Sequence, residues 1–215
     1  MKPLSLTLKN FGPYINETID FTKFEDSSLF LISGKTGSGK TTIFDGMSYA
    51  LFGESSGKLR LGKEMRSTFA DPSEATEVTL LFKHNEFLYE LNRLPEQELF
   101  KKRGTGVRKQ SAKISLIVKD AQGKELRAYS KRREVDELIQ ELLHLNANQF
   151  AQIVLLPQGE FRTFLIAKSD EKEKVLRNLF GTELYQLFSE NLKERLKIAN
   201  QEIQETQQKI ELKTE

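Results

Sequence analysis

The first sixty residues combine strand-like and helix-like patterns of apolar positions. Leu4, Leu6 and Leu8 alternate with polar residues, which predicts a half-buried strand. Ile19 and Phe21 indicate a second, shorter strand after a turn sequence, Phe-Gly-Pro-Tyr, that breaks the first pattern. The chain is therefore expected to open with two short strands.

A third strand, a glycine-rich loop and a helix are expected next. Residues 29–32 are an unbroken apolar run, as expected for a strand that is buried on both faces. Beyond the loop, apolar residues recur at three- and four-residue spacing on one helix face, at Ile43, Phe44, Met47, Ala50 and Leu51. Gly53 is expected to end this helix. This order of elements predicts an α/β fold.

The middle of the chain is patterned as antiparallel strands. Residues 77–93 predict a hairpin with its turn at 84–86, and residues 114–118 with the turn at 120–123 predict a second pair. Residues 101–113, KKRGTGVRKQSAK, show no apolar pattern, so we expect a mobile loop there. Together these segments predict an antiparallel β subdomain at about residues 77–129.

Helical periodicity begins near Lys131 and continues to the end of the chain. Residues 192–213 carry apolar side chains at an alternating four-three spacing, with Glu, Gln and Lys on the remaining faces. This spacing predicts the start of a coiled coil at 183–215, after a head at 1–182; an amphipathic helix packed on a core is the alternative. The chain reaches residue 215 without a cap or a terminator, so we expect the coil to continue beyond it.

Composition removes several classes of protein. A chain of 215 residues has the length of about one large domain. The absence of cysteine excludes a disulfide framework and a thiolate metal site. No apolar run approaches the roughly 18 residues of a membrane helix, and the N-terminus does not resemble a signal peptide. We therefore expect no membrane and a cytoplasmic location.

The strongest chemical signal is a phosphate-loop motif. Residues 34–41, GKTGSGKT, fit the pattern GxxxxGK[ST] at every fixed position, between an expected strand and an expected helix. Such a loop surrounds phosphates with backbone N–H groups, here those of Gly34, Lys35, Thr36, Gly37, Ser38 and Gly39. Lys40 would supply charge to the β and γ oxygens of ATP, and the Thr41 hydroxyl would bind Mg²⁺. The alternative is a flexible Gly/Ser loop.

A glutamine in the third quarter of the chain is a weaker candidate. Gln158 lies in LLPQGEF, where Pro157 restrains the backbone and Gly159 frees it. Its amide oxygen could bind Mg²⁺ or hold a water without a permanent charge. From the residues alone, a surface turn explains this segment equally simply.

Positive charge is concentrated in one stretch. Residues 101–133 carry 12 Lys and Arg against 2 Asp and Glu, although the whole chain has a net charge of only +2. Such a cluster suits sequence-independent contacts with DNA phosphates, with the candidates Lys101, Lys102, Arg103, Arg108 and Lys109. A solvated loop is the alternative.

The sequence contains half of an ATPase site. Such a site needs a carboxylate after a buried strand, and the nearest candidate, LIVKD at 116–120, is interrupted by Lys119 and patterned as a hairpin arm. An LSGGQ-like signature and a histidine after a second buried strand are also absent.

Four segments together resemble one family. They are LSLTLKNFGPY, SGKTGSGKTTIFDGMSYALFGE, QFAQIVLLPQGEFRTFL and LRNLFGTELY. They are similar to the N-terminal half of the ATPase head in the SbcC family of SMC-like double-strand-break repair ATPases, and the resemblance covers essentially the whole chain. One departure is Gly12, where relatives outside the SbcC family often carry a basic residue.

The resemblance implies a fold and a set of roles. The fold would be the N-terminal half of an ABC-type head, with a phosphate-loop core, the antiparallel β subdomain and a coiled-coil stub. Lys40 would be the phosphate lysine, Thr42 would contact the α-phosphate, and Gln158 would be the Q-loop glutamine in a region at 149–165. Lys40 and Gln158 would act in catalysis, and Thr41 and Gln158 would hold Mg²⁺.

The resemblance also implies partners. These are the C-terminal half of the same head, a second such head in an ATP sandwich, the SbcD nuclease and double-stranded DNA. The complex would process DNA ends and hairpins in repair and recombination, in a bacterial cytoplasm and near the nucleoid. Without the missing motifs, this chain alone would be inactive as an ATPase. An SMC-type DNA-tethering head without a nuclease partner is the alternative.

Overall fold

A computed structural model of the chain describes residues 1–24, 30–56, 62–101, 105–151 and 183–214. By contacts the chain divides into two units, Met1–Pro157 and Gln158–Glu215. Among the described residues, no helix is both long enough and apolar enough to cross a membrane.

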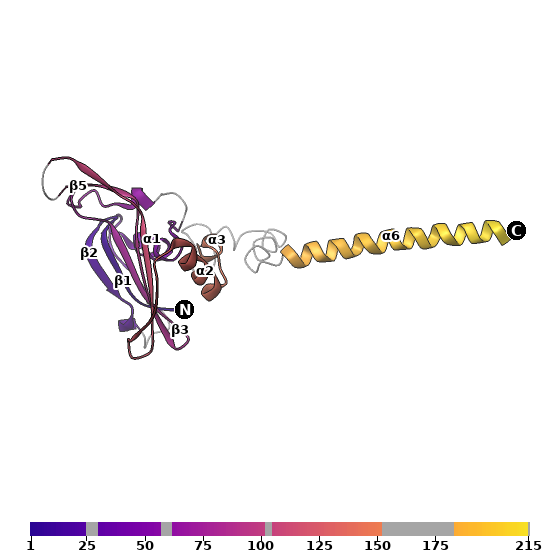
Figure 1. The fold of residues 1–215 in the computed structure, drawn as a ribbon, viewed down its shortest axis with the longest axis horizontal. Helices are drawn as coiled ribbons and strands as arrows, with labels where there is room; N and C mark the ends of the chain where they lie inside the picture. Colours follow the sequence, from indigo (N-terminus) through magenta and orange to yellow (C-terminus); the bar gives the residue numbers. More distant parts are fainter. Residues whose placement is uncertain (25–29, 57–61, 102–104, 152–182, 215) are drawn as a thin grey trace. The chain divides into compact units, whose positions relative to one another are not determined.

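The first unit is built on one antiparallel sheet of six strands (Figure 1). Its strand order is β2-β1-β3-β4-β7-β8. The strands are β1 (Lys2–Phe11), β2 (Tyr14–Asp20), β3 (Glu77–His84), β4 (Phe87–Leu94), β7 (Lys113–Lys119) and β8 (Glu125–Tyr129). The predicted strands at the N-terminus and both predicted antiparallel pairs are therefore confirmed. The strands predicted as a β subdomain are continuous with the N-terminal pair in this single sheet.

One face of the sheet forms the core. Alternate residues point to that face, and the register aligns them into a row of fully buried leucines across four strands, at Leu6, Leu80, Leu91 and Leu116. The opposite face carries polar positions such as Thr79, which pairs with Asn92 and lies next to Thr7. An antiparallel sheet with one solvated face shows this alternation, which is why the sequence pattern was informative.

Three helices accompany the sheet in this unit: α1 (Lys40–Phe52), α2 (Arg132–Leu143) and the short α3 (Ala147–Phe150). Helix α1 packs on β1, β3 and β4, while α2 packs on β7 and on α1 (Figure 1). Four of the five residues predicted for the apolar face of α1 are buried: Ile43, Met47, Ala50 and Leu51. Gly53 ends α1 at φ 76°, a left-handed conformation that favours glycine, as predicted.

The strand predicted at residues 29–32 is wrong for the residues that are described. Residues 30–35 form no strand, and Leu31 is 88% exposed. A strand buried on both faces needs a neighbour on each side, and no described strand pairs with this segment. The apolar run is therefore present without the sheet that would bury it.

The loop predicted at residues 101–113 is wrong in part. β6 (Val107–Gln110) pairs with β5 (Gln97–Phe100) in a separate two-stranded ribbon. Val107, Arg108 and Lys109 are all exposed, so β6 has no buried face and no alternation that a sequence pattern could reveal.

The second unit contains one long described helix, α6 (Glu183–Thr214). The predicted seam residues Leu192, Leu196, Ile203 and Ile210 are 50–62% exposed on it. A helix with an exposed apolar stripe of this spacing suits a coiled-coil partner, and the coil and the domain boundaries at 182 and 183 stay predictions.

Candidate nucleotide-binding site

The phosphate-loop motif connects residue 33 to the first turn of α1. Gly37 and Gly39 adopt φ values of +83° and +89°, a region that side chains disfavour and glycine allows. Ser38 N donates to Lys35 O at 3.2 Å, which closes the turn, and residues 33–38 are exposed. The loop thus leaves its backbone accessible directly before the N-terminal, positive end of α1.

Lys40 lies at the start of α1 with its side chain folded along the loop. Its Nζ donates to Gly34 O and to Lys35 O, both at 2.8 Å. The ammonium group is therefore held beside the loop, where it could meet a phosphate oxygen. Thr41 and Thr42 follow in the first helical turn, with Thr41 exposed and Thr42 half-buried.

The β1–β2 turn forms a wall against this loop. The Tyr14 hydroxyl donates to Gly39 O at 3.2 Å, and Ile43 N donates to the same oxygen at 3.3 Å. A Cβ atom at position 39 would lie 2.6 Å from Pro13 Cγ and 2.9 Å from the Tyr14 hydroxyl oxygen. The last loop glycine is therefore required both by its φ angle and by the packing of this turn.

Glycine at position 12 also has a local reason. Gly12 has φ +57°, and its N–H donates to Met65 O at 2.7 Å. A Cβ atom there would lie 2.6 Å from Thr42 Cγ2. The departure from relatives with a basic residue at this position thus accompanies a close approach of the turn to α1.

Comparison with known proteins identifies the family. A family described as an AAA domain matches residues 5–215. The chain belongs to the AAA domain family. Curated relatives of this AAA domain are also close: the SbcC component of the nuclease SbcCD from Lactococcus lactis is 46% identical over 197 residues, which are 90% of this chain and 18% of that protein.

A second relative covers more of the chain. The protein of the same name from Staphylococcus aureus strain MRSA252 is 45% identical over 212 residues, 99% of this chain and 20% of that protein. The resemblance to SbcC predicted from the sequence is therefore confirmed. The chain spans about a fifth of the length of these curated relatives.

One solved structure comes from work on "Structural biochemistry of ATP-driven dimerization and DNA stimulated activation of SMC ATPases". It matches with a TM-score of 0.45 and 17% sequence identity, over 83% of this chain and 99% of that one.

The opposite end of α1 in this AAA domain is held by a buried arginine. Arg93, on β4, is 5% exposed and donates from Nε to Ala50 O at 3.0 Å and from Nη2 to Leu51 O at 3.3 Å. Its Nη2 also lies 2.9 Å from a carboxylate oxygen of Asp136 on α2. One side chain thus satisfies carbonyls at the C-terminal end of α1 and joins β4, α1 and α2.

Sequence reasoning missed Arg93, although a signal was present. In β4, Tyr89 and Leu91 have the parity of the buried face, and Arg93 is the next residue of that parity. A charged residue in the core-facing register of a strand is rarely buried unless it is paired. Because Asp136 is 43 residues away in sequence, the partner could not be chosen from the strand alone.

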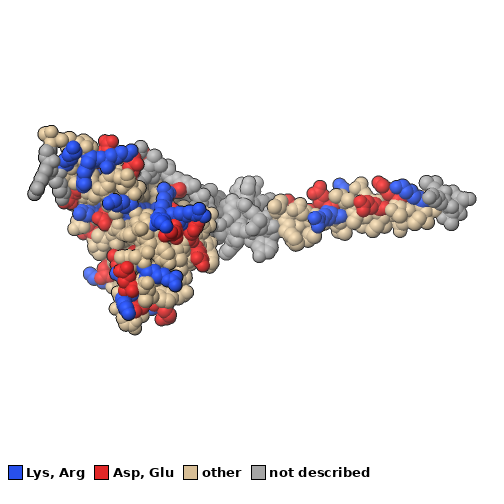
Figure 2. Space-filling view, in the orientation of Figure 1, with Lys and Arg blue, Asp and Glu red and all other residues tan. Residues whose placement is uncertain are grey.

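The predicted DNA-contacting residues fall on or beside the β5–β6 ribbon, where Lys and Arg side chains gather in Figure 2. Lys101 and Arg108 are exposed. Lys109 instead pairs with Glu96 at 3.0 Å, and this hydrogen bond raises the pKa of the Lys109 ammonium group. Part of the ribbon's positive charge is therefore balanced within the AAA domain itself. Lys102 and Arg103 lie outside the described residues, and so does Gln158.

Proposed function

We propose that this chain is the ATP-binding half of an SbcC-like ATPase head. The observation that carries the proposal is the phosphate loop, with Gly37 and Gly39 at positive φ, an accessible backbone and Lys40 held beside it at the start of α1. Backbone amides at a helix N-terminus together with one lysine form the donor set that ATP phosphates require. Membership of the AAA domain family supports nucleotide as the ligand.

Within this proposal each loop residue has a chemical task. The amides of residues 34–39 and the Lys40 ammonium group hold the β and γ phosphates, while Thr42 contacts the α-phosphate. The exposed Thr41 hydroxyl and the amide oxygen of Gln158 bind Mg²⁺, which suits oxygen ligands of this kind. Gln158 would also respond to the γ-phosphate through the metal ion during catalysis.

The proposal includes a further segment that completes the head. The exposed apolar residues Phe30 and Leu31 suit burial against additional strands, and the catalytic carboxylate and the signature motif would come from the same source. This chain spans about a fifth of the length of its matched relatives, which supports such a segment. This chain alone would then bind ATP without turning it over.

The proposed assembly follows the name of the relatives. Proteins named as one component of a two-part nuclease support an SbcD-like nuclease partner, which we place near the start of α6. Two heads would enclose ATP between them, and ATP would favour the engaged state because it binds that state more tightly. The task would be the processing of DNA ends and hairpins in the bacterial cytoplasm.

Equilibrium binding of Mg²⁺-ATP to the chain tests the nucleotide role. Lys40→Ala removes the ammonium group that would meet the phosphates, and a hydrogen bond to a charged group contributes about 1.5–3 kcal/mol. We therefore expect the affinity for ATP to fall by roughly 10- to 150-fold. Lys35→Ala is the matched control, since the Lys35 side chain makes no hydrogen bond among the described contacts of the loop. Equal affinities of the wild-type chain and Lys40→Ala would refute the proposed site.

The proposed DNA contacts are tested by salt dependence. Lys101→Gln combined with Arg108→Gln should weaken binding to a DNA duplex and reduce the slope of log affinity against log salt by about two. Lys109→Gln should change the slope less, because Glu96 already balances that charge. An unchanged slope in the double variant would exclude the ribbon from the DNA contacts.

A further inference from the structure

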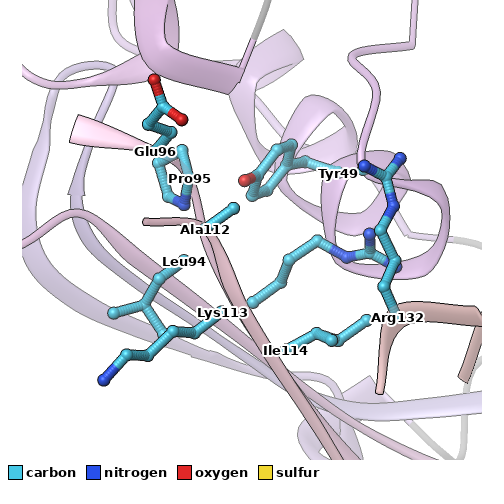
Figure 3. Close-up of a pocket in the computed structure, with 10 residues that line it drawn as sticks. Tyr49, Leu94, Pro95, Glu96, Ala112, Lys113, Ile114 and Arg132 are labelled. Carbon is cyan, nitrogen blue, oxygen red and sulfur yellow. The ribbon is translucent and has the colours of Figure 1, made fainter. Parts of the chain in front are cut away.

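A pocket lies beside the C-terminal end of α1, at the end opposite to the phosphate loop. It has a volume of about 250 Å³. It is lined by Tyr49 and Gly53 of the α1 end, by residues 93–96 and 112–114 of the β4 and β7 strand ends, and by Arg132 of α2. Figure 3 shows Tyr49 reaching in from the helix while Pro95 and Ala112 face it from the strands. The volume is large enough for a tetrahedral anion with water around it.

The charges around this pocket do not cancel. Asp136 receives Arg93 through one carboxylate oxygen, at 2.9 Å, and Arg132 through the other, at 3.2 Å. Two guanidinium groups therefore share one carboxylate, which leaves one positive charge. Glu96 at the rim does not balance it, because Glu96 pairs with Lys109 at 3.0 Å.

The guanidinium groups keep donors for a ligand. Arg93 uses Nε and Nη2 for the α1 carbonyls and Asp136, and Arg132 uses Nε for Asp136. The described contacts of both arginines leave Nη1 uncommitted. Arg132 is 75% exposed and stands at the edge of the pocket beside Tyr49 (Figure 3). The amine of Lys113, in contrast, points away from the Tyr49 hydroxyl.

The Tyr49 hydroxyl supplies a third donor. Tyr49 is only 4% exposed and lines the pocket, and among the described contacts its hydroxyl has no hydrogen-bond partner. Burial raises the pKa of this phenol to about 12, so at neutral pH it keeps its proton and can donate. A ligand oxygen in the pocket would therefore give the hydroxyl a partner that the described residues do not provide.

We propose that this pocket binds a phosphate group, through the Arg132 and Arg93 guanidinium groups and the Tyr49 hydroxyl. Guanidinium donors match tetrahedral oxyanions in a forked geometry, and a neutral hydroxyl adds a donor without adding charge. The phosphate comes either from a nucleic-acid backbone or from a small phosphate ester. The site is separate from the phosphate loop, which lies at the other end of α1, and it does not depend on ATP binding there.

Backbone amide shifts in ¹H–¹⁵N NMR spectra test this site. The probes are inorganic phosphate and a 20-base-pair duplex, and the chain carries Lys40→Ala so that the phosphate loop contributes less. We expect the amides of Gly53 and Arg132 to shift in a saturable way. Arg132→Gln should weaken the binding about tenfold and Tyr49→Phe about threefold.

The matched control is Arg133→Gln. It removes the same charge from the neighbouring helical position, where Arg133 pairs with Glu137 at 2.7 Å and does not line the pocket. It should leave the Gly53 response unchanged. Saturation by phosphate alone would assign the site to small phosphate esters, and tighter saturation by the duplex would assign it to the nucleic-acid backbone. No saturable response to either probe, or equal losses in Arg132→Gln and Arg133→Gln, would overturn the proposal.

Discussion

Helix α1 has two ends that are built in different ways. At its N-terminal end the contacts come from backbone and glycine: exposed amides, Gly39 at positive φ and Lys40 folded onto loop carbonyls. At its C-terminal end the contacts come from a buried side chain, because Arg93 donates to two helix carbonyls and pairs with Asp136. Exposed donors at one end remain available to a ligand, while buried donors at the other end are used for stability.

This difference separates two kinds of experimental effect. A change at the N-terminal end should alter ligand binding with little effect on unfolding, since exposed polar groups contribute little to stability. A change at the C-terminal end should alter unfolding, since a buried charge that loses its partner keeps its desolvation cost. Three substitutions test the comparison, in decreasing order of expected effect.

The largest expected effect is that of Arg93→Met. The substitution leaves the Asp136 carboxylate without its buried partner and removes the donors to Ala50 O and Leu51 O. Breaking such a pair costs about 3–5 kcal/mol. Chemical denaturation should show a loss of this size in the free energy of unfolding. Arg127→Met, at an exposed position of β8, is the control and should change it by less than about 0.5 kcal/mol. Similar small losses in both variants would mean that Arg93 does not hold the helix end.

This first prediction also shows what the sequence could supply. The strands with local partners were predictable, since a hairpin such as 77–94 carries its alternation and its turn in one short stretch. The phosphate loop was predictable because its function fixes residue types at fixed spacing. Contacts that join distant segments were not. Arg93 with Asp136, and Tyr14 with Gly39 across 25 residues, depend on how the sheet aligns its strands.

The two errors have the same physical origin. The apolar run at 29–32 predicted a buried strand, yet burial depends on neighbouring strands, and no described strand pairs with residues 30–32. β6 was predicted as a loop, because its pairing with β5 is visible only in the register that places Leu99 opposite Arg108. A local pattern reports which residues prefer burial, whereas the partner that provides it can lie anywhere in the fold.

The second substitution, Tyr49→Phe, tests the buried end through pH. The pKa of Tyr49 is raised from 10.0 to about 12, so the unfolded chain loses this proton first as the pH rises. The contribution to stability is complete below pH 10 and is lost between about pH 10 and 12. At pH 11 the loss attributable to Tyr49 should be about 1.4 kcal/mol. Tyr49→Phe should become less sensitive to this pH range in denaturation experiments, and an unchanged alkaline slope would contradict the assignment.

The smallest expected effect is that of Tyr14→Phe. The substitution removes only the hydroxyl that donates to Gly39 O and keeps the ring against the loop. Because a peptide group is planar and trans, fixing the Gly39 carbonyl also fixes the direction of the Lys40 N–H. A net hydrogen bond contributes about 0.5–1.5 kcal/mol, so ATP affinity should fall by roughly two- to tenfold. Tyr89→Phe is the control and should leave it unchanged; equal ATP affinities in all three proteins would remove Tyr14 from the site.

ATP turnover by this chain, alone and mixed with a separately produced C-terminal head segment, tests the central claim most directly. The account predicts no turnover by the chain alone. It predicts turnover in the mixture that Lys40→Ala abolishes and Gln158→Ala reduces while ATP binding persists. Turnover by the chain alone that depends on Lys40 would contradict the account, because the catalytic carboxylate would then already be present in these 215 residues.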